Sequence, residues 1–154
     1  MIKKVLLALL VLFVVLQLFR PSPNQSEPAA FSASGDITRL FPPSPAVKHT
    51  LEVACYDCHS NHTNYPWYAQ VQPVAWWLGR HVSEGRKKLN FSEFSAYSAK
   101  RKLKKLEDLT DEVRDHTMPL SSYEWMHREA RLNEAEINAL CAWAESAQDQ
   151  IAEK

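Results

Sequence analysis

The chain has few glycines, few cysteines and no excess of charge, and each shortage excludes a class of protein. Its 154 residues include three glycines, too few for a glycine-rich phosphate loop or for the many turns of an all-β domain. Lys plus Arg and Asp plus Glu number 18 each, so the zero formal charge gives no support for nucleic-acid binding. Only three cysteines are present, and two of them belong to one short motif, so no pair is left for a disulfide framework.

That motif is Cys55-Tyr56-Asp57-Cys58-His59, which has the C-x-x-C-H spacing of c-type haem attachment. Two thiols that add across the two vinyl groups of one porphyrin must lie a short, fixed distance apart. The histidine that follows then lies against the ring face and can offer a nitrogen to the iron. We therefore predict one haem c per chain, covalently held by Cys55 and Cys58, with His59 as an axial iron ligand.

Two other uses of the motif are open from the sequence. A tetrahedral zinc site could be formed by two thiolates and two imidazoles, those of Cys55, Cys58, His59 and His62. A structural zinc site usually takes its second ligand pair from a distant segment, however, whereas these four crowd into eight residues. A dithiol redox pair is the other use, but the βαβ pattern that usually surrounds one is not seen nearby. The spacing favours haem.

Residues 1–19 have the pattern of a signal peptide or a membrane anchor. Lys3 and Lys4 precede an apolar run from Val5 to Phe19, and no small-residue cleavage site follows the run directly. Fifteen helical residues cover roughly 22 Å, short of the ~30 Å hydrocarbon core, and counting from Ile2 gives a marginal span. We expect an uncleaved transmembrane helix with the domain on the extracytoplasmic, periplasmic side of the inner membrane. A cleaved chain would be soluble in the periplasm.

Residues 20–45 read as a proline-rich linker. They contain six of the nine prolines, at Pro21, Pro23, Pro28, Pro42, Pro43 and Pro45. Serine and asparagine are frequent, and no apolar period is present. Because such a composition buries too little surface to offset its ordering entropy, we expect an extended, mobile tether.

Residues 46–150 are predicted to form one haem-binding domain. Asn133 with Glu136 three residues later has the pattern of a capping box at the start of the last helix. Neither a strand pattern nor an internal repeat is seen, so we predict an all-α, cytochrome c-like fold. Apolar residues recur at helical spacing in four places, which are 46–54, the stretch after Pro73, 97–115 and 134–150.

Three more residues are predicted to contact the haem. Trp67 lies in an irregular aromatic segment expected to fold over one haem edge. His81 lies on an apolar helical stripe, where it is either a core residue or a haem contact. Met118 precedes Pro119 at a helix end, and the stiff proline would present the thioether from a fixed loop, so we assign it as second axial ligand. His81 is the main competitor. The other candidates considered are Met126, His62, His116 and His127.

The chain resembles the bacterial haem-binding domain family of small, membrane-anchored c-type cytochromes. The resemblance covers most of residues 46–145 and rests on three segments, ACYDCHSNHTNYPWY, QPVAWWLGRHVSEGRKKLNFSEF and MPLSSYEWMHREARL. It implies a helical, cytochrome-like domain with haem ligation at Cys55, Cys58 and His59, and it suggests Met118 as the distal ligand.

These observations predict an extracytoplasmic electron carrier. A covalently held haem with two protein ligands has no open iron position, so the iron can only change its charge. The expected partner is a redox protein, and the chain is not expected to be an enzyme. The alternatives are an accessory or assembly subunit of a membrane oxidase or peroxidase complex, and a sensor or enzyme with an open iron site.

Overall fold

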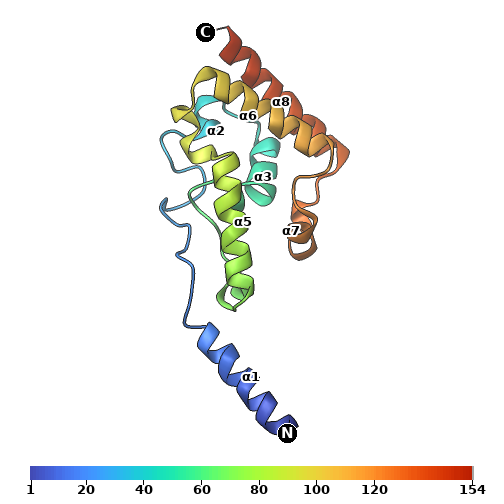
Figure 1. Ribbon diagram of the computed structural model, residues 1–154. Coiled ribbons are helices and arrows are strands. Elements are labelled where there is room, and N and C mark those ends of the chain that lie inside the picture. The colour runs from blue at the N-terminus through green and yellow to red at the C-terminus, as the bar shows by residue number, and fades with distance from the viewer. Residues whose placement is uncertain (154) are drawn as a thin grey trace.

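The computed structural model describes residues 1–153, and every regular element in them is a helix (Figure 1). Extended pairing among these residues is limited to one isolated bridge, between Gln25 and His62. The predicted all-α class is confirmed. The α-helices are α1 (Ile2–Leu16), α2 (Ile37–Leu40), α3 (Pro45–Ala54), α4 (Tyr56–His59), α5 (Val74–Lys88), α6 (Ala99–Arg114), α7 (Ser121–Met126) and α8 (Glu134–Ala152). Short 3₁₀ turns lie between these helices: η1 (Trp67–Gln70) before α5, η2 (Phe91–Ala96) before α6 and η3 (Arg128–Ala130) before α8.

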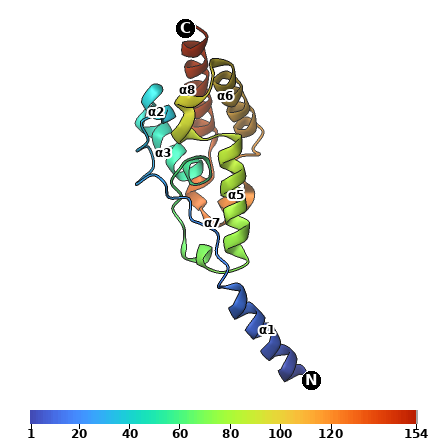
Figure 2. The same ribbon diagram turned by 60° about the vertical axis from the view of Figure 1, so that its left-hand side comes forward.

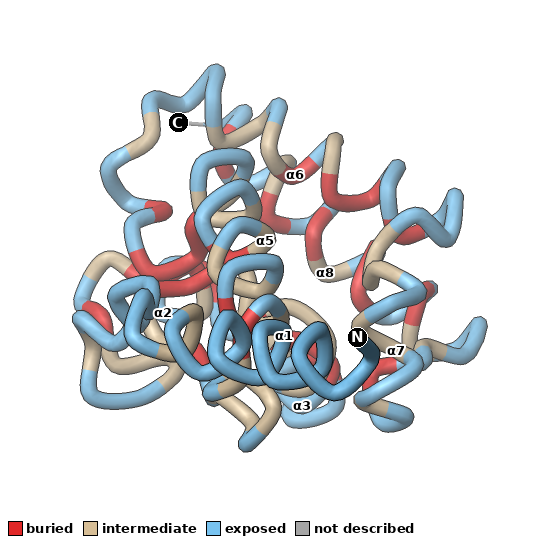
Figure 3. The backbone as a smooth tube through the Cα atoms, turned by 60° about the horizontal axis from the view of Figure 1, so that its bottom comes forward, coloured by how far each residue is buried: buried red, intermediate tan, exposed pale blue. Residues whose placement is uncertain are grey.

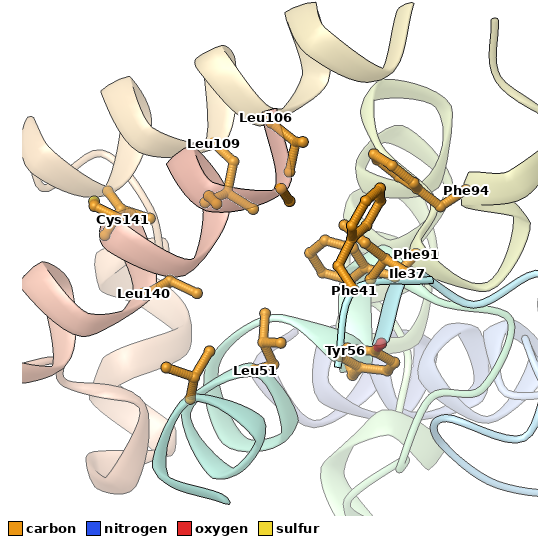
Figure 4. Close-up of a cluster of buried hydrophobic side chains, with 14 of the residues drawn as sticks. Ile37, Phe41, Leu51, Tyr56, Phe91, Phe94, Leu106, Leu109, Leu140 and Cys141 are labelled. Carbon is orange, nitrogen blue, oxygen red and sulfur yellow. The ribbon is translucent and has the colours of Figure 1, made fainter. Parts of the chain in front are cut away.

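Helices α6 and α8 pack against each other along one side of the molecule (Figure 1). The predicted capping box is present, because Asn133 accepts from the backbone of Glu136 and the Glu136 carboxylate accepts from the Asn133 amide. Ser98 caps the start of α6, because its hydroxyl accepts from the Arg101 amide. Both helices bury one apolar stripe in the shared core (Figure 4), as their periodicity predicts. The main contributors are Leu106, Leu109, Val113, Ile137, Leu140, Cys141 and Ala144.

Helix α3 joins this core to the C-x-x-C-H motif. Ser44 caps it, Pro45 occupies its first turn, and Leu51 packs inward against the core (Figure 4). The next turn buries Tyr56, whose ring stacks on Phe91 with centroids 5.0 Å apart. The motif is therefore anchored in the core by Tyr56, the first of the two residues between its cysteines.

Residues 24–41 do not form the mobile tether that their composition predicts. Asn24 is buried and donates to the Ser60 carbonyl at 2.8 Å and to the Thr63 hydroxyl at 2.9 Å. Further along, Ile37 and Phe41 belong to the main core. The prediction was wrong because Ile37 and Phe41 pack into the core that the later helices form, and their burial offsets the cost of ordering the segment.

Helix α1 extends away from the rest of the chain, and its side chains are exposed along almost the whole helix (Figures 2 and 3). It has 15 residues, Ile2–Leu16, so at 1.5 Å per residue it is roughly 22 Å long. In residues 1–153 no helix combines the length and the apolar character needed to cross a membrane. The transmembrane helix expected over residues 1–19 is thus not found, because the helix ends three residues before Phe19.

Candidate haem-binding site

The C-x-x-C-H motif forms a single helical turn between α3 and α5. Cys55 ends α3, and its carbonyl accepts from the amides of Cys58 at 3.2 Å and His59 at 3.0 Å. Positions three and four residues apart share a helix face, so both thiols and the imidazole lie on one side of this turn. Helix α5 packs directly on the turn at Gly85, where a Cβ atom would lie 2.7 Å from the Cys58 carbonyl oxygen. Only glycine fits at this contact.

His59 is oriented by a hydrogen bond that it donates to the backbone at the C-terminal end of α5. Its Nδ1 lies 3.0 Å from the carbonyl oxygen of Leu89, which can only accept, so Nδ1 carries the proton. That tautomer leaves the Nε2 lone pair for a metal, as in most metal-ligating histidines. Burial lowers the pKa of His59, and the charge of Lys105 adds to this, although backbone hydrogen bonds to Leu89 and Gly85 oppose it. The imidazole is therefore neutral at physiological pH, which is the form that binds iron.

Both motif cysteines are free, and as whole residues they are half-buried. Burial, helped by the neighbouring Cys58, raises the pKa of Cys55 to about 12. Burial, helped by the charge of Asp57, raises the pKa of Cys58 to about 11. Both groups are thus protonated thiols at neutral pH, poorly reactive toward oxidants that need a thiolate.

A mainly apolar pocket opens beside Cys58, between α5 and α7. It contains side chains able to ligate iron, which are His81, Met126 and His127. The His81 ring also contacts Trp77 edge to face, with centroids 4.5 Å apart. The remaining lining includes Leu78, Val82, Leu120 and Tyr123.

Helix α7 is tied to the motif through a side chain that the sequence analysis did not single out. The Tyr123 hydroxyl donates to Asp57 Oδ2 at 2.8 Å and lies 3.2 Å from the Val53 carbonyl. The Tyr123 ring stacks on His127 with centroids 4.2 Å apart, and His127 Nε2 lies 2.9 Å from the Tyr68 hydroxyl. The spacing of Tyr123 and His127, four residues apart in a helix, is the signal that could have paired them.

The other predicted contacts lie outside this pocket. Met118 is half-buried, and its amide donates to the Glu112 carbonyl where α6 ends, but its side chain does not line the pocket. Trp67 is 79% exposed and contacts Tyr68. Its predicted place over a haem edge is not tested by this arrangement, and neither is the ligation by Met118.

The zinc alternative has no support in the described chain. His62 Nδ1 donates to the Glu27 carbonyl at 2.9 Å, which ties the ring to the N-terminal segment. Across residues 1–153, no three His, Cys, Asp or Glu side chains are grouped as a metal ion would require.

The arrangement fits a haem. Two free thiols lie one helical turn apart, and the bond to Leu89 leaves Nε2 of His59 uninvolved. An apolar pocket adjoins the second thiol: Cys58 lines this pocket, whereas Cys55 and His59 do not. An all-helical chain that carries this motif has the features of a haem-binding domain.

Comparison with known families agrees: the model of the family described as "haem-binding domain" matches residues 11–146, so the chain belongs to that family. No curated protein and no solved structure matches the chain.

Proposed function

We propose that the protein is a c-type cytochrome that carries electrons through one covalently attached haem. The observation that carries the proposal is the hydrogen bond from His59 Nδ1 to the Leu89 carbonyl. It supports the tautomer that leaves Nε2 for iron, in a motif whose two thiols have the attachment spacing.

Attachment uses the thiols without net oxidation. Each of Cys55 and Cys58 would add across one vinyl group, so that a carbon–sulfur bond forms, the vinyl π bond breaks and the thiol hydrogen passes to the other vinyl carbon. Because burial keeps both groups protonated, the pair resists closing to a disulfide before attachment.

Haem, when bound, supplies an iron that gains and loses one electron. The chain's own groups would control that exchange. His59 would ligate the iron, and the bond to Leu89 raises the basicity of its imidazole. The apolar side chains of α5 and α7 exclude water from the pocket. A second side chain would also ligate the iron, for which Met118 remains our assignment and His81 the main competitor.

We place this chemistry on the extracytoplasmic side of the inner membrane, with a redox protein as partner. Haem attachment at C-x-x-C-H takes place on that side, and Lys3 and Lys4 before an apolar segment are the pattern of an exported chain. The exposed apolar side chains of α1 support membrane association of the N-terminal segment. Fractionation of cells, followed by intact mass of the chain, tests both points.

The visible spectrum of the purified holoprotein tests the proposed function. A carrier gives a six-coordinate, low-spin iron whose reduced form does not bind carbon monoxide. A five-coordinate iron that binds carbon monoxide readily would contradict it and favour a sensor or enzyme with an open position. Oxidised and reduced spectra, each with and without the gas, separate the two outcomes.

A further inference from the structure

Charge is strongly segregated along this neutral chain. Residues 80–105 contain nine Lys and Arg against two Asp and Glu, whereas residues 107–153 contain three against twelve. A zero net charge therefore hides a basic region and an acidic region. Such segregation can attract a charged partner to one region of the surface, even though the net charge of the whole chain is zero.

The fold gathers much of the basic region where α5 ends and α6 begins. The two helices are joined there through Tyr97, whose hydroxyl accepts from the Asn90 amide at 3.0 Å and whose ring lies 4.9 Å from the Arg101 guanidinium carbon. We define the basic face as Lys87, Lys88, Arg101, Lys102 and Lys105.

The basic face has no counter-charge of its own. Lys87, Lys88 and Arg101 are exposed, and Lys102 and Lys105 are half-buried. Among the residues that the structure describes, none of the five forms an ion pair, whereas the nearby Lys104 pairs with Glu107 and Asp108. Arg86 is turned inward and donates to Asn61 at 2.7 Å. The five charges are available to a partner.

This face lies next to the proximal ligand. The Leu89 carbonyl that accepts from His59 Nδ1 belongs to the residue directly after Lys88. The charge of Lys105, on α6, also contributes to lowering the pKa of the His59 ring. One hydrogen bond thus links the predicted iron ligand to backbone at the edge of the basic face.

We propose that the basic face docks an acidic redox protein, and that electrons pass to it through the His59–Leu89 hydrogen bond. The inference rests on the proposed electron-carrier function. Complementary charge brings the partner to this side and mainly raises the association rate. Electron exchange is expected on this side, and not in the acidic half of the molecule, because the predicted iron ligand His59 is bonded to backbone at the edge of the basic face.

The test is stopped-flow oxidation of the reduced holoprotein by hexacyanoferrate(III), a small anionic probe. We expect the rate to fall as ionic strength rises, as for a positively charged protein. The double variant Lys87→Glu with Lys88→Glu should react about three- to tenfold more slowly at low salt, and faster than wild type with a cationic cobalt(III) complex. The control is Arg128→Glu with Arg131→Glu, two exposed arginines near η3 that give the same change in net charge.

Wild-type rates in the basic-face variant would overturn the proposal, and so would equal slowing in the control, since electrons would then leave elsewhere. Binding to phosphatidylglycerol vesicles that the variant loses, with the hexacyanoferrate rate unchanged, would make the face a lipid contact and also overturn it. Spectra with carbon monoxide are recorded for all three proteins. If wild-type iron binds carbon monoxide, the proposed electron-carrier function is wrong. If the spectra show a closed, six-coordinate iron but the basic-face variant reacts at the wild-type rate, only the docking proposal is wrong.

Discussion

The His59 ring is held in a fixed orientation by the protein itself. Its Nδ1–H is donated to the carbonyl of Leu89, thirty residues further along the chain. The motif itself predicts that this histidine is a ligand, but it cannot name the hydrogen-bond acceptor. Neither can it predict Gly85, which is required because α5 touches the Cys58 carbonyl. Both contacts depend on how a distant helix packs, and local sequence carries no signal for that.

At the same scale, burial of the motif thiols leads us to expect that they are alkylated slowly in the folded apoprotein. With its pKa raised from 9.0 to about 11, Cys58 is only about one part in a thousand thiolate at pH 8, against about a tenth at its ordinary pKa. Iodoacetamide should therefore modify Cys58 about a hundredfold more slowly in the folded than in the urea-unfolded chain. Peptide mass spectrometry over time measures both rates. Equal rates would show that the thiol is not protected.

Single substitutions can also identify the second axial ligand of the iron. We expect Met118→Ala to open the iron to carbon monoxide and to lower the reduction potential, because thioether ligation raises it. The matched changes are His81→Ala and Met126→Ala, both in the pocket beside Cys58. Carbon monoxide binding in the His81 variant alone would make the site bis-histidine, and in the Met126 variant alone would place the ligand on α7.

At the scale of elements, Tyr123 is predicted to hold α7 over the site. Tyr123→Phe removes the hydrogen bond to the Asp57 carboxylate and should lower the free energy of unfolding of the apoprotein by about 1–2 kcal/mol. It should also speed amide exchange in α7. Trp125→Phe on the same helix is the control, since Trp125 is 75% exposed. If the two variants have the same stability and exchange rates, Tyr123 is not what holds the helix.

The long helices were predictable, and so was the short helix that holds Trp125 and Met126, but the four-residue helices were not. Periodicity and the Asn133 capping box place the last helix at 134–150, and α8 runs over Glu134–Ala152. Helix α2 has four residues, too few to show a period. It exists because the buried Asp36 caps it and also accepts from the Tyr56 hydroxyl at 2.8 Å. That partner is twenty residues away, so only the folded chain reveals it.

At the scale of the whole molecule, the N-terminal segment is predicted to contribute to stability and not only to reach. Ile37 is fully buried in the main core, so Ile37→Ala should lower the free energy of unfolding by about 2–5 kcal/mol. Leu40→Ala, three residues along and 40% exposed, is the control and should cost less than about 1 kcal/mol. Denaturant unfolding of both variants measures the difference. If neither substitution changes the free energy of unfolding, the N-terminal segment is a mobile linker after all.

The central claim, that Cys55 and Cys58 carry one haem covalently, is tested most directly by intact mass after denaturation. The holoprotein is unfolded in acid, extracted with organic solvent and weighed. We predict that the colour stays with the polypeptide, that its mass exceeds the sequence mass by one haem, and that Cys55→Ala with Cys58→Ala loses both. Colour in the solvent, with the polypeptide at its sequence mass, would contradict the account.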